Sequence, residues 1–332
     1  MGYQTGTAND VSDLLEKLSI FASTLGWTVD KFVSGTSPEL YLHNADGYWS
    51  FGVTRPSSSY KYALFILGNT GFDNALAWTA QPGSSYTNHG STSSWFANYR
   101  GAGTTELVRG AGPFISYDFF GTAQYLHVIV QITAASFRHF GIGTLNREGN
   151  YTGGQYTYGT AYNPFGNSGV DSNPDYNTYP FCDRTVYGDN FSSAVRADAL
   201  GDSGSSPYWF LFGATLAGIG AIGLGGSVLY NSGTYSRRHP DTMAVATSQS
   251  QLGAVIAPVP NAIMVIGADG LWRRLGIVPD IAVCRMMGIT SRGQLELNGE
   301  TWMIVPPIKY MADGRIVGEN SHVLGYAYRI TP

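Results

Sequence analysis

The string Gly201-Asp-Ser-Gly204 comes nearest to a catalytic motif in this sequence. In one class of serine proteases the same string surrounds the nucleophile, and its glycines free the backbone to bind an oxyanion. The chemistry also needs a general-base histidine. The best candidate is His139, but in Thr133-Ala-Ala-Ser-Phe-Arg-His139 it lies too far from the small residues that precede it. The 34 residues from Ser203 to Ser236 carry no charge and show no alternating strands. We therefore interpret the string as a turn in which Asp202 and Ser203 bond local backbone.

Three glycines, Gly218, Gly220 and Gly223, form the pattern GxGxxG. In dinucleotide-binding proteins this pattern lets the backbone approach a pyrophosphate at the start of a helix. The residues that follow here are poor helix formers. Asp241 lies near the spacing of a ribose-binding acid, but no strand–helix–strand alternation surrounds it. We predict no cofactor.

Metal ligands are also sparse. Asp171-Ser-Asn-Pro-Asp175 has the alternating oxygens of a calcium loop, but Tyr176 replaces the sixth-position glycine and Cys182 the twelfth-position glutamate. An Asx-turn is the favoured interpretation. Cys182 and Cys284 lie in no CxxC or Cys/His spacing and are expected to be buried thiols. The histidines are expected to be structural, with satisfied hydrogen bonds. There are six of them: His43, His89, His127, His139, His239 and His322.

Two segments have compositions suited to contact with a partner. The tyrosine-rich residues 151–159 could stack on sugars or cover a protein, and the second is favoured because tyrosine offers broad area with a polar tip. Residues 208–230 are uncharged and long enough to span a bilayer. Their six glycines fit a close-packed protein contact at least as well. We expect residues 203–236 to lie in a core or subunit interface, with membrane insertion as the weaker alternative.

One helix is indicated near the N-terminus. Asn9 is a candidate N-cap, and Gly26 follows the last apolar residue as a C-cap. Between them the spacing i, i+3, i+4, i+7 marks one apolar stripe. The stripe consists of Val11, Leu14, Leu15, Leu18, Phe21, Ala22 and Leu25.

After Trp27 the hydrophobic period becomes two, which indicates strands at 39–43, 48–53 and 62–67. The continuously apolar run at 124–133 predicts a strand buried on both faces. Residues 146–191 are expected to form long loops and hairpins. Near the C-terminus, Asn298-Gly299 separates two alternating runs, 294–297 and 300–305, as a type I′ β-hairpin requires. A final strand is predicted at 323–330.

Composition bounds the fold and the partners. The 332 residues include 43 glycines, with 14% aromatic and only 13% charged residues, which favours a mainly β (α+β) protein whose neutral surface contacts other proteins. The predicted fold is the N-terminal amphipathic helix followed by sandwich-like or barrel-like β domains with long Gly/Tyr-rich loops. The chain is predicted to divide into an N-terminal domain with the helix and a β-sheet, residues 1–135, and a β-rich interaction domain, residues 136–332. The net charge of −4 and the lack of basic runs disfavour nucleic acid. Residues 1–7 do not resemble a signal peptide, so folding in a cytosol is expected.

Three collinear groups of strings resemble segments of virion structural proteins of tailed bacteriophages, of the tail, baseplate or tail-fibre-associated type. The strings are Tyr3-Gln-Thr-Gly-Thr-Ala8, Asp13-Leu-Leu-Glu-Lys-Leu18, Gly26-Trp-Thr-Val29, Phe137-Arg-His-Phe-Gly-Ile-Gly-Thr-Leu145, Tyr151-Thr-Gly-Gly154, Gly299-Glu-Thr-Trp-Met-Ile-Val-Pro306 and Gly325-Tyr-Ala-Tyr328. None of them is a functional motif, so the resemblance transfers no catalytic, cofactor or metal residue.

The resemblance implies a non-enzymatic component of the virion that is assembled in the host bacterial cytoplasm. Its expected partners are other tail or baseplate proteins and further copies of itself, in a symmetric ring or trimer. The alternative is a receptor-binding module at the tail tip that contacts host surface glycan. An enzyme, either a hydrolase at Ser203 or a cell-wall-degrading tail protein, is the third possibility; no convincing carboxylate pair supports the latter.

Overall fold

The computed structural model describes residues 1–54, 63–85, 112–133, 136–159, 191–198, 209–213, 222–224, 258–266, 272–285, 290–305 and 324–331. Within these residues the chain forms one helix and three antiparallel sheets, which confirms the mainly β prediction. All pairings between neighbouring strands are antiparallel. The sheets are named here the N-terminal, central and C-terminal sheets.

The central sheet has eight strands in the order β1-β6-β7-β8-β10-β11-β12-β13. Their bounds are β1 Gly2–Ala8, β6 Phe114–Gly121, β7 Tyr125–Thr133, β8 Ser136–Thr144, β10 Thr152–Gly159, β11 Phe191–Asp198, β12 Trp209–Gly213 and β13 Ile222–Leu224. The predicted domain boundary at residue 135 falls between β7 and β8, which pair with each other in this sheet. The division into two domains stays a prediction.

The other two sheets contain strands that are local in sequence. The N-terminal sheet, in the order β2-β3-β4-β5, comprises β2 Thr28–Val33, β3 Glu39–Asn44, β4 Gly47–Thr54 and β5 Ala63–Asn69. The C-terminal sheet, in the order β14-β15-β18-β17-β16, comprises β14 Val259–Ile266, β15 Trp272–Arg285, β16 Gly293–Leu297, β17 Glu300–Val305 and β18 Leu324–Arg329, and the short β9, Asn146–Arg147, pairs with β15.

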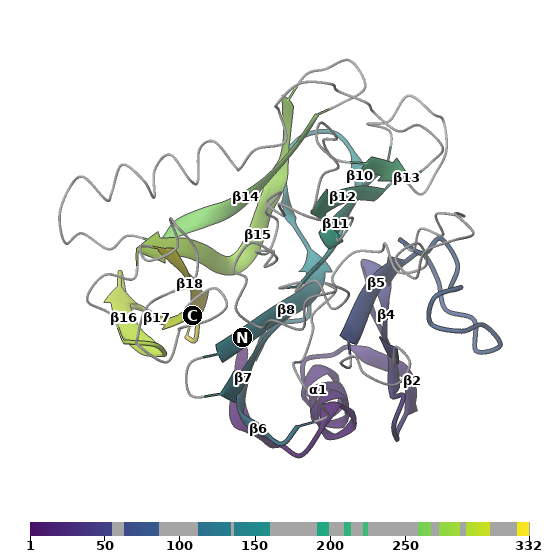
Figure 1. Cartoon of the computed structure of the whole chain (residues 1–332). Coiled ribbons are helices and arrows are strands. Elements are labelled where there is room, and N and C mark those ends of the chain that lie inside the picture. Colours follow the sequence, from purple (N-terminus) through teal and green to yellow (C-terminus); the bar gives the residue numbers. More distant parts are fainter. Residues whose placement is uncertain are drawn as a thin grey trace, which may run out of the picture.

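The central sheet lies between the other two, and each of its faces contributes to a separate hydrophobic core (Figure 1). Strand β7 shows why. Leu126 and Val128 pack into the core shared with α1 and the N-terminal sheet, whereas Tyr125 and Ile129 pack into the core shared with the C-terminal sheet. Successive side chains of a strand point to opposite faces. The prediction that this apolar run is buried on both faces is confirmed.

Helix α1, Val11–Thr24, packs between the N-terminal sheet and the edge of the central sheet (Figure 1). Its N-cap is Asp10, whose side chain accepts a hydrogen bond from the Asp13 backbone N–H at 2.8 Å. The prediction that Asn9 is the N-cap was wrong by one residue. The Asn9 backbone N–H instead donates a hydrogen bond to the Asp13 carboxylate at 2.7 Å. At the other end Gly26 has φ +88° and follows the C-cap Leu25, as in a Schellman motif.

The C-terminal hairpin forms as its turn chemistry predicts. Strands β16 and β17 pair with Leu297 opposite Glu300, so Asn298 and Gly299 are the two turn residues. Asn298 has φ +52° and Gly299 has φ +83°. A type I′ turn requires this left-handed backbone at both positions, and Asn-Gly adopts it at low cost.

Two strands lie where the sequence showed no alternation. Within residues 203–236, β12 pairs with β11 and β13 pairs with β12 at the end of the central sheet. The Trp209 side chain is buried there, and its indole N–H donates to the Gly83 carbonyl at 3.0 Å. A strand in an uncharged run rich in glycine and aromatic residues cannot be recognised by alternation, because neither of its faces carries polar residues.

Candidate functional site

Several motifs considered above lie outside the described residues. These are Gly201-Asp-Ser-Gly204, the calcium-like residues 171–175, Gly218 and Gly220 of the glycine pattern, Cys182, and the histidines His89, His239 and His322. The third glycine of the pattern, Gly223, lies in β13. Cys284 is a buried free thiol, as predicted, and burial raises its pKa to about 12.

The tyrosine-rich residues 151–159 are not a partner-contacting loop. Residues 152–159 form β10 between β8 and β11, near the middle of the central sheet. Tyr156 and Tyr158 are completely buried and Tyr151 nearly so, all three in the core against the C-terminal sheet. Tyrosine serves as a core residue here because its ring fills this space, and the hydroxyls of Tyr151 and Tyr158 have internal hydrogen-bond partners.

Tyr158 belongs to a polar network centred on His127 of β7. The His127 Nε2–H donates to the Pro279 carbonyl of β15 at 2.8 Å, so Nδ1 carries no proton. That nitrogen accepts a hydrogen bond from the Tyr158 hydroxyl at 2.9 Å. Both ring nitrogens of His127 are therefore hydrogen-bonded to groups on other strands, as predicted for a structural histidine.

The network continues to a second histidine on β8. The Tyr158 oxygen accepts from the Tyr328 hydroxyl of β18, and the Tyr328 oxygen is 2.8 Å from Nδ1 of His139. Since the Tyr328 proton is directed to Tyr158, His139 Nδ1 must be the donor. The hydrogen bonds therefore run in one direction, from His139 through Tyr328 and Tyr158 to His127, and end at the Pro279 carbonyl.

Burial keeps this network neutral. It lowers the pKa of His127 to about 4 and raises the pKa of Tyr158 and Tyr328 well above the ordinary value for tyrosine. A general base needs a pKa near the working pH and a free nitrogen that reaches its substrate. His127 has neither. The network ties β7, β8, β10, β15 and β18 together by satisfied hydrogen bonds.

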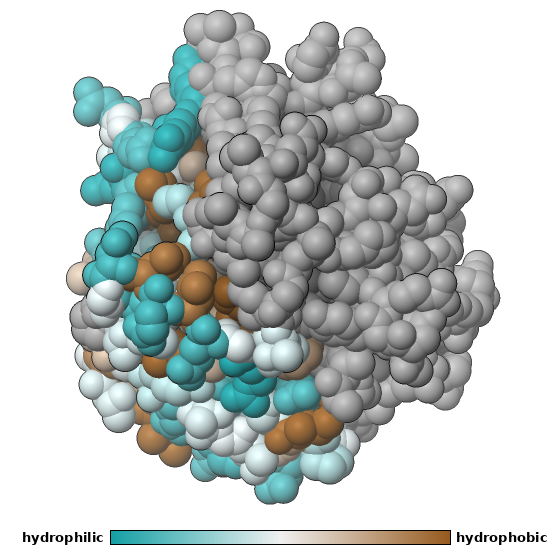
Figure 2. Space-filling view, turned by 90° about the vertical axis from the view of Figure 1, so that its left-hand side faces the viewer, coloured by the Kyte–Doolittle hydropathy of each residue, from teal (hydrophilic) through white to brown (hydrophobic). Residues whose placement is uncertain are grey.

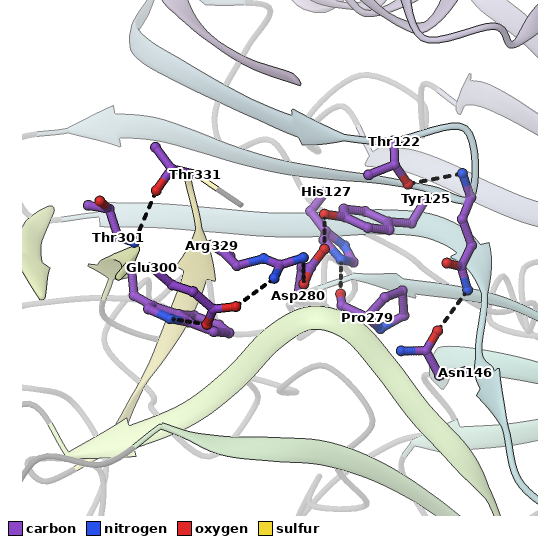
Figure 3. Close-up of polar contacts among 12 residues, drawn as sticks. Thr122, Tyr125, His127, Asn146, Pro279, Asp280, Glu300, Thr301, Arg329 and Thr331 are labelled. Atoms are coloured by element: carbon purple, nitrogen blue, oxygen red, sulfur yellow. Dashed lines mark hydrogen bonds and ion pairs between the residues drawn. The ribbon is translucent and has the colours of Figure 1, made fainter. Parts of the chain in front are cut away.

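A charged junction lies beside the network, at the bend of β15 (Figure 3). Asp280 has the left-handed φ of +55°. One carboxylate oxygen accepts from the Tyr125 hydroxyl of β7 at 2.5 Å, and the other pairs with Arg329 of β18 at 2.6 Å. Arg329 also pairs with Glu300 of β17 at 2.7 Å. Burial, together with the hydrogen bond to Asp280, raises the pKa of Tyr125, so its hydroxyl stays protonated.

A second charged junction joins the C-terminal hairpin to the edge of the central sheet. Arg292, just before β16, pairs with Asp118 of β6 at 2.6 Å and donates to the Ser116 hydroxyl at 2.9 Å. The Tyr3 hydroxyl of β1 donates to the same Asp118 oxygen at 2.9 Å. The Asp118 side chain is only 2% exposed. A carboxylate this deeply buried depends on such partners, because an uncompensated buried charge is strongly unfavourable.

Indole groups connect the N-terminal sheet and its neighbouring segments to the central sheet. Trp49 of β4 donates its indole N–H to the Tyr156 carbonyl of β10 at 3.0 Å, and Trp27 donates to the Thr122 carbonyl at 2.8 Å. The two indole rings lie 5.2 Å apart between centroids. Each tryptophan thus buries its ring in the core and directs its one donor to the backbone of the next layer.

The polar groups of the described residues therefore form a set of connections between layers. Among those residues, no three His, Cys, Asp or Glu side chains are grouped to hold a metal ion, and no helix has the length and hydropathy to cross a bilayer. No known protein family matches the chain, and no curated protein matches it at a significant level.

Sequence reasoning missed Asp118, Asp280, Arg292 and Arg329. The available signal was a charge within an otherwise apolar run. Asp118 stands in Tyr-Asp-Phe-Phe, and Asp280 follows Pro279 inside the long strand β15. A charge in such a place needs an internal partner. The sequence does not show which distant arginine supplies it.

Proposed function

We propose that the protein is a non-enzymatic structural component of a tailed-phage virion, in the tail or baseplate, that acts through protein–protein interfaces. The observation that carries this proposal is that contacts between layers fasten the three sheets together: charged and tyrosine side chains join the central and C-terminal sheets, and tryptophan indoles join the N-terminal layer to the central sheet. Asp118 with Arg292 and Tyr125 with Asp280 each join a strand of the central sheet to the C-terminal part of the chain. A component of a symmetric assembly needs this property, because its interfaces must keep a fixed geometry.

Composition and resemblance give independent support. Low charge and abundant aromatic residues suit surfaces that contact other proteins. On the side of the molecule where β16 and β17 lie, the described surface is mostly polar with scattered hydrophobic side chains (Figure 2). The strings that resemble tail proteins extend from β1 to β18. The proposed partners are other tail or baseplate proteins and further copies of this chain, assembled in the host cytoplasm, without nucleic acid or a cofactor.

The receptor-binding alternative needs different residues from those first considered. Tyr151, Tyr156 and Tyr158 are buried, so they present no ring to a glycan. Residues 203–236 stay our proposed contact segment, and membrane insertion of this segment stays the weaker alternative.

Labelling of purified particles tests the proposal. Phage particles carrying a C-terminal epitope on this chain are purified through a density gradient and stained with gold-conjugated antibody. Gold at one recurrent position on the tail is expected. A host cytosolic protein with the same epitope is the control, because it shows how much host protein co-purifies with the particles. Gold no more frequent than in this control would refute the proposal.

A further inference from the structure

Strand β1 is an edge strand of the central sheet. Among the described residues it pairs with β6 on one side and with no strand on the other. Its seven residues, Gly-Tyr-Gln-Thr-Gly-Thr-Ala, carry no charge and no proline. Gln4, Thr5 and Thr7 are exposed to solvent. An edge of this kind offers unpaired N–H and C=O groups to another strand.

The other edges of the described sheets are protected. Strand β2 has Asp30, Lys31 and a register irregularity, β14 has Pro260, and β16 has the exposed Glu296. Strand β5 is covered by Ser85, whose N–H donates to the Gly68 carbonyl at 2.8 Å. Strand β13 has only three residues. Charges, prolines, bulges and short length all discourage edge pairing, so β1 differs from these edges.

The position of β1 is fixed. It pairs with β6 from Gly2 to Gly6, and the Thr5 hydroxyl donates to the Tyr117 carbonyl at 3.0 Å. The Arg292 guanidinium contacts Thr5 as well. Lys17 donates to the Thr7 carbonyl at 2.8 Å, which limits the open edge to residues 2–6. A strand held in this way is a preformed template, because its ordering entropy has already been lost on folding.

We propose that this open edge pairs antiparallel with β1 of a second copy of the chain, so that the two central sheets continue into one. The second copy is the occupant because residues 2–6 carry no charged side chain, so pairing of two copies places no like-charged side chains opposite each other on the two strands. A two-fold axis at Gln4 places Tyr3 opposite Thr5 of the other copy, which is a favourable aromatic–β-branched cross-strand pair. The inference rests on the self-association contained in the proposed function and names the surface responsible.

Charge substitution at the axis tests the pairing. In a two-fold pair the Gln4 side chains of the two copies are direct neighbours, so Gln4→Lys or Gln4→Glu brings like charges together. Sedimentation equilibrium of the untagged full chain is expected to show a dimer, and each variant is expected to raise its dissociation constant about fivefold. Mixing the two variants should restore association through opposite charges. Gln4→Met, which also loses the hydrogen bond from Gln4 to the Tyr117 hydroxyl, is the uncharged control and should still dimerise.

The outcomes separate this inference from the proposed function. A wild-type chain that stays monomeric at every concentration reached overturns the pairing, even if labelled particles contain the chain. An oligomer that is unaffected by both charged variants also overturns it. If the variants behave as expected but particles lack the chain, the pairing stands and the virion function fails. Restoration in the mixture shows that the charged variants are folded.

Discussion

The Tyr125 hydroxyl donates to Asp280 Oδ2 over 2.5 Å, across the boundary between the central and C-terminal sheets. Asp280 reaches this position through a left-handed backbone conformation, φ +55°, which is uncommon for a residue with a side chain. The bend of β15 therefore places the Asp280 carboxylate between the Tyr125 hydroxyl of β7 and the Arg329 guanidinium of β18.

Removal of this hydroxyl should weaken the contact between the sheets. Among the described residues, Tyr125→Phe leaves the Asp280 carboxylate with Arg329 as its remaining side-chain partner. The expected loss in the free energy of unfolding is about 2 kcal/mol. Urea titration followed by tryptophan fluorescence measures it. The control is Tyr48→Phe at a half-buried tyrosine, expected within about 0.5 kcal/mol of wild type. Equal effects of the two substitutions would contradict this account.

The Asp118–Arg292 pair should behave as one unit. Arg292→Met leaves Asp118 buried without its cation and should reduce the free energy of unfolding by about 3 kcal/mol. Adding Asp118→Asn removes the uncompensated charge, so the double variant should be more stable than Arg292→Met alone. A double-mutant cycle with urea titration measures the coupling. Simple addition of the two single effects would show that the pair does not act as described.

Acid should destabilise the fold through His127. Its pKa in the folded protein is about 4, below the ordinary 6.5, because burial disfavours the charged ring. The unfolded chain therefore binds the proton first, and this contribution to stability is present above pH 6.5 and is lost as the pH falls toward 4. The loss is about 3 kcal/mol.

The free energy of unfolding is measured against pH for wild type and His127→Gln, which cannot titrate. The wild-type curve should fall more steeply between these pH values. Parallel curves for the two proteins would mean that the buried imidazole does not contribute.

Gly68 should not tolerate a side chain. A Cβ at this position in β5 would come within 2.1 Å of the buried Trp209 ring. Because that ring is packed in the core, Gly68→Ala should lower the free energy of unfolding by about 2 kcal/mol. At Gly71 the nearest heavy atom would be 3.5 Å from the added Cβ, so Gly71→Ala is the matched control. Thermal melting of both variants measures the difference, and a wild-type melting temperature for Gly68→Ala would contradict the packing described.

The parts of the fold that the sequence predicted well depend on local chemistry or on simple periodicity. The Asn298-Gly299 turn defines its hairpin because few other dipeptides adopt two left-handed conformations. The run in β7 indicated burial on both faces because apolar side chains occupy both sides of the strand, with His127 the one polar residue between Tyr125 and Val130.

The layers and the internal site depend on long-range pairing. Tyr156 and Tyr158 were interpreted as surface residues because tyrosine suits both surfaces and cores, and only the strands on either side of β10 decide between them. The Asp280 junction unites residues from β7, β15, β17 and β18. Their charges indicate that partners exist, but their identity follows from sheet order, which a single sequence does not reveal.

Cryo-electron microscopy of purified tailed particles tests the central claim most directly. We predict density into which the three sheets and α1 fit, repeated symmetrically at one level of the tail or baseplate, with neighbouring copies or other tail proteins on its surface. Particles whose tail and baseplate density is fully accounted for by other chains, and whose peptides by mass spectrometry exclude this one, would contradict the claim.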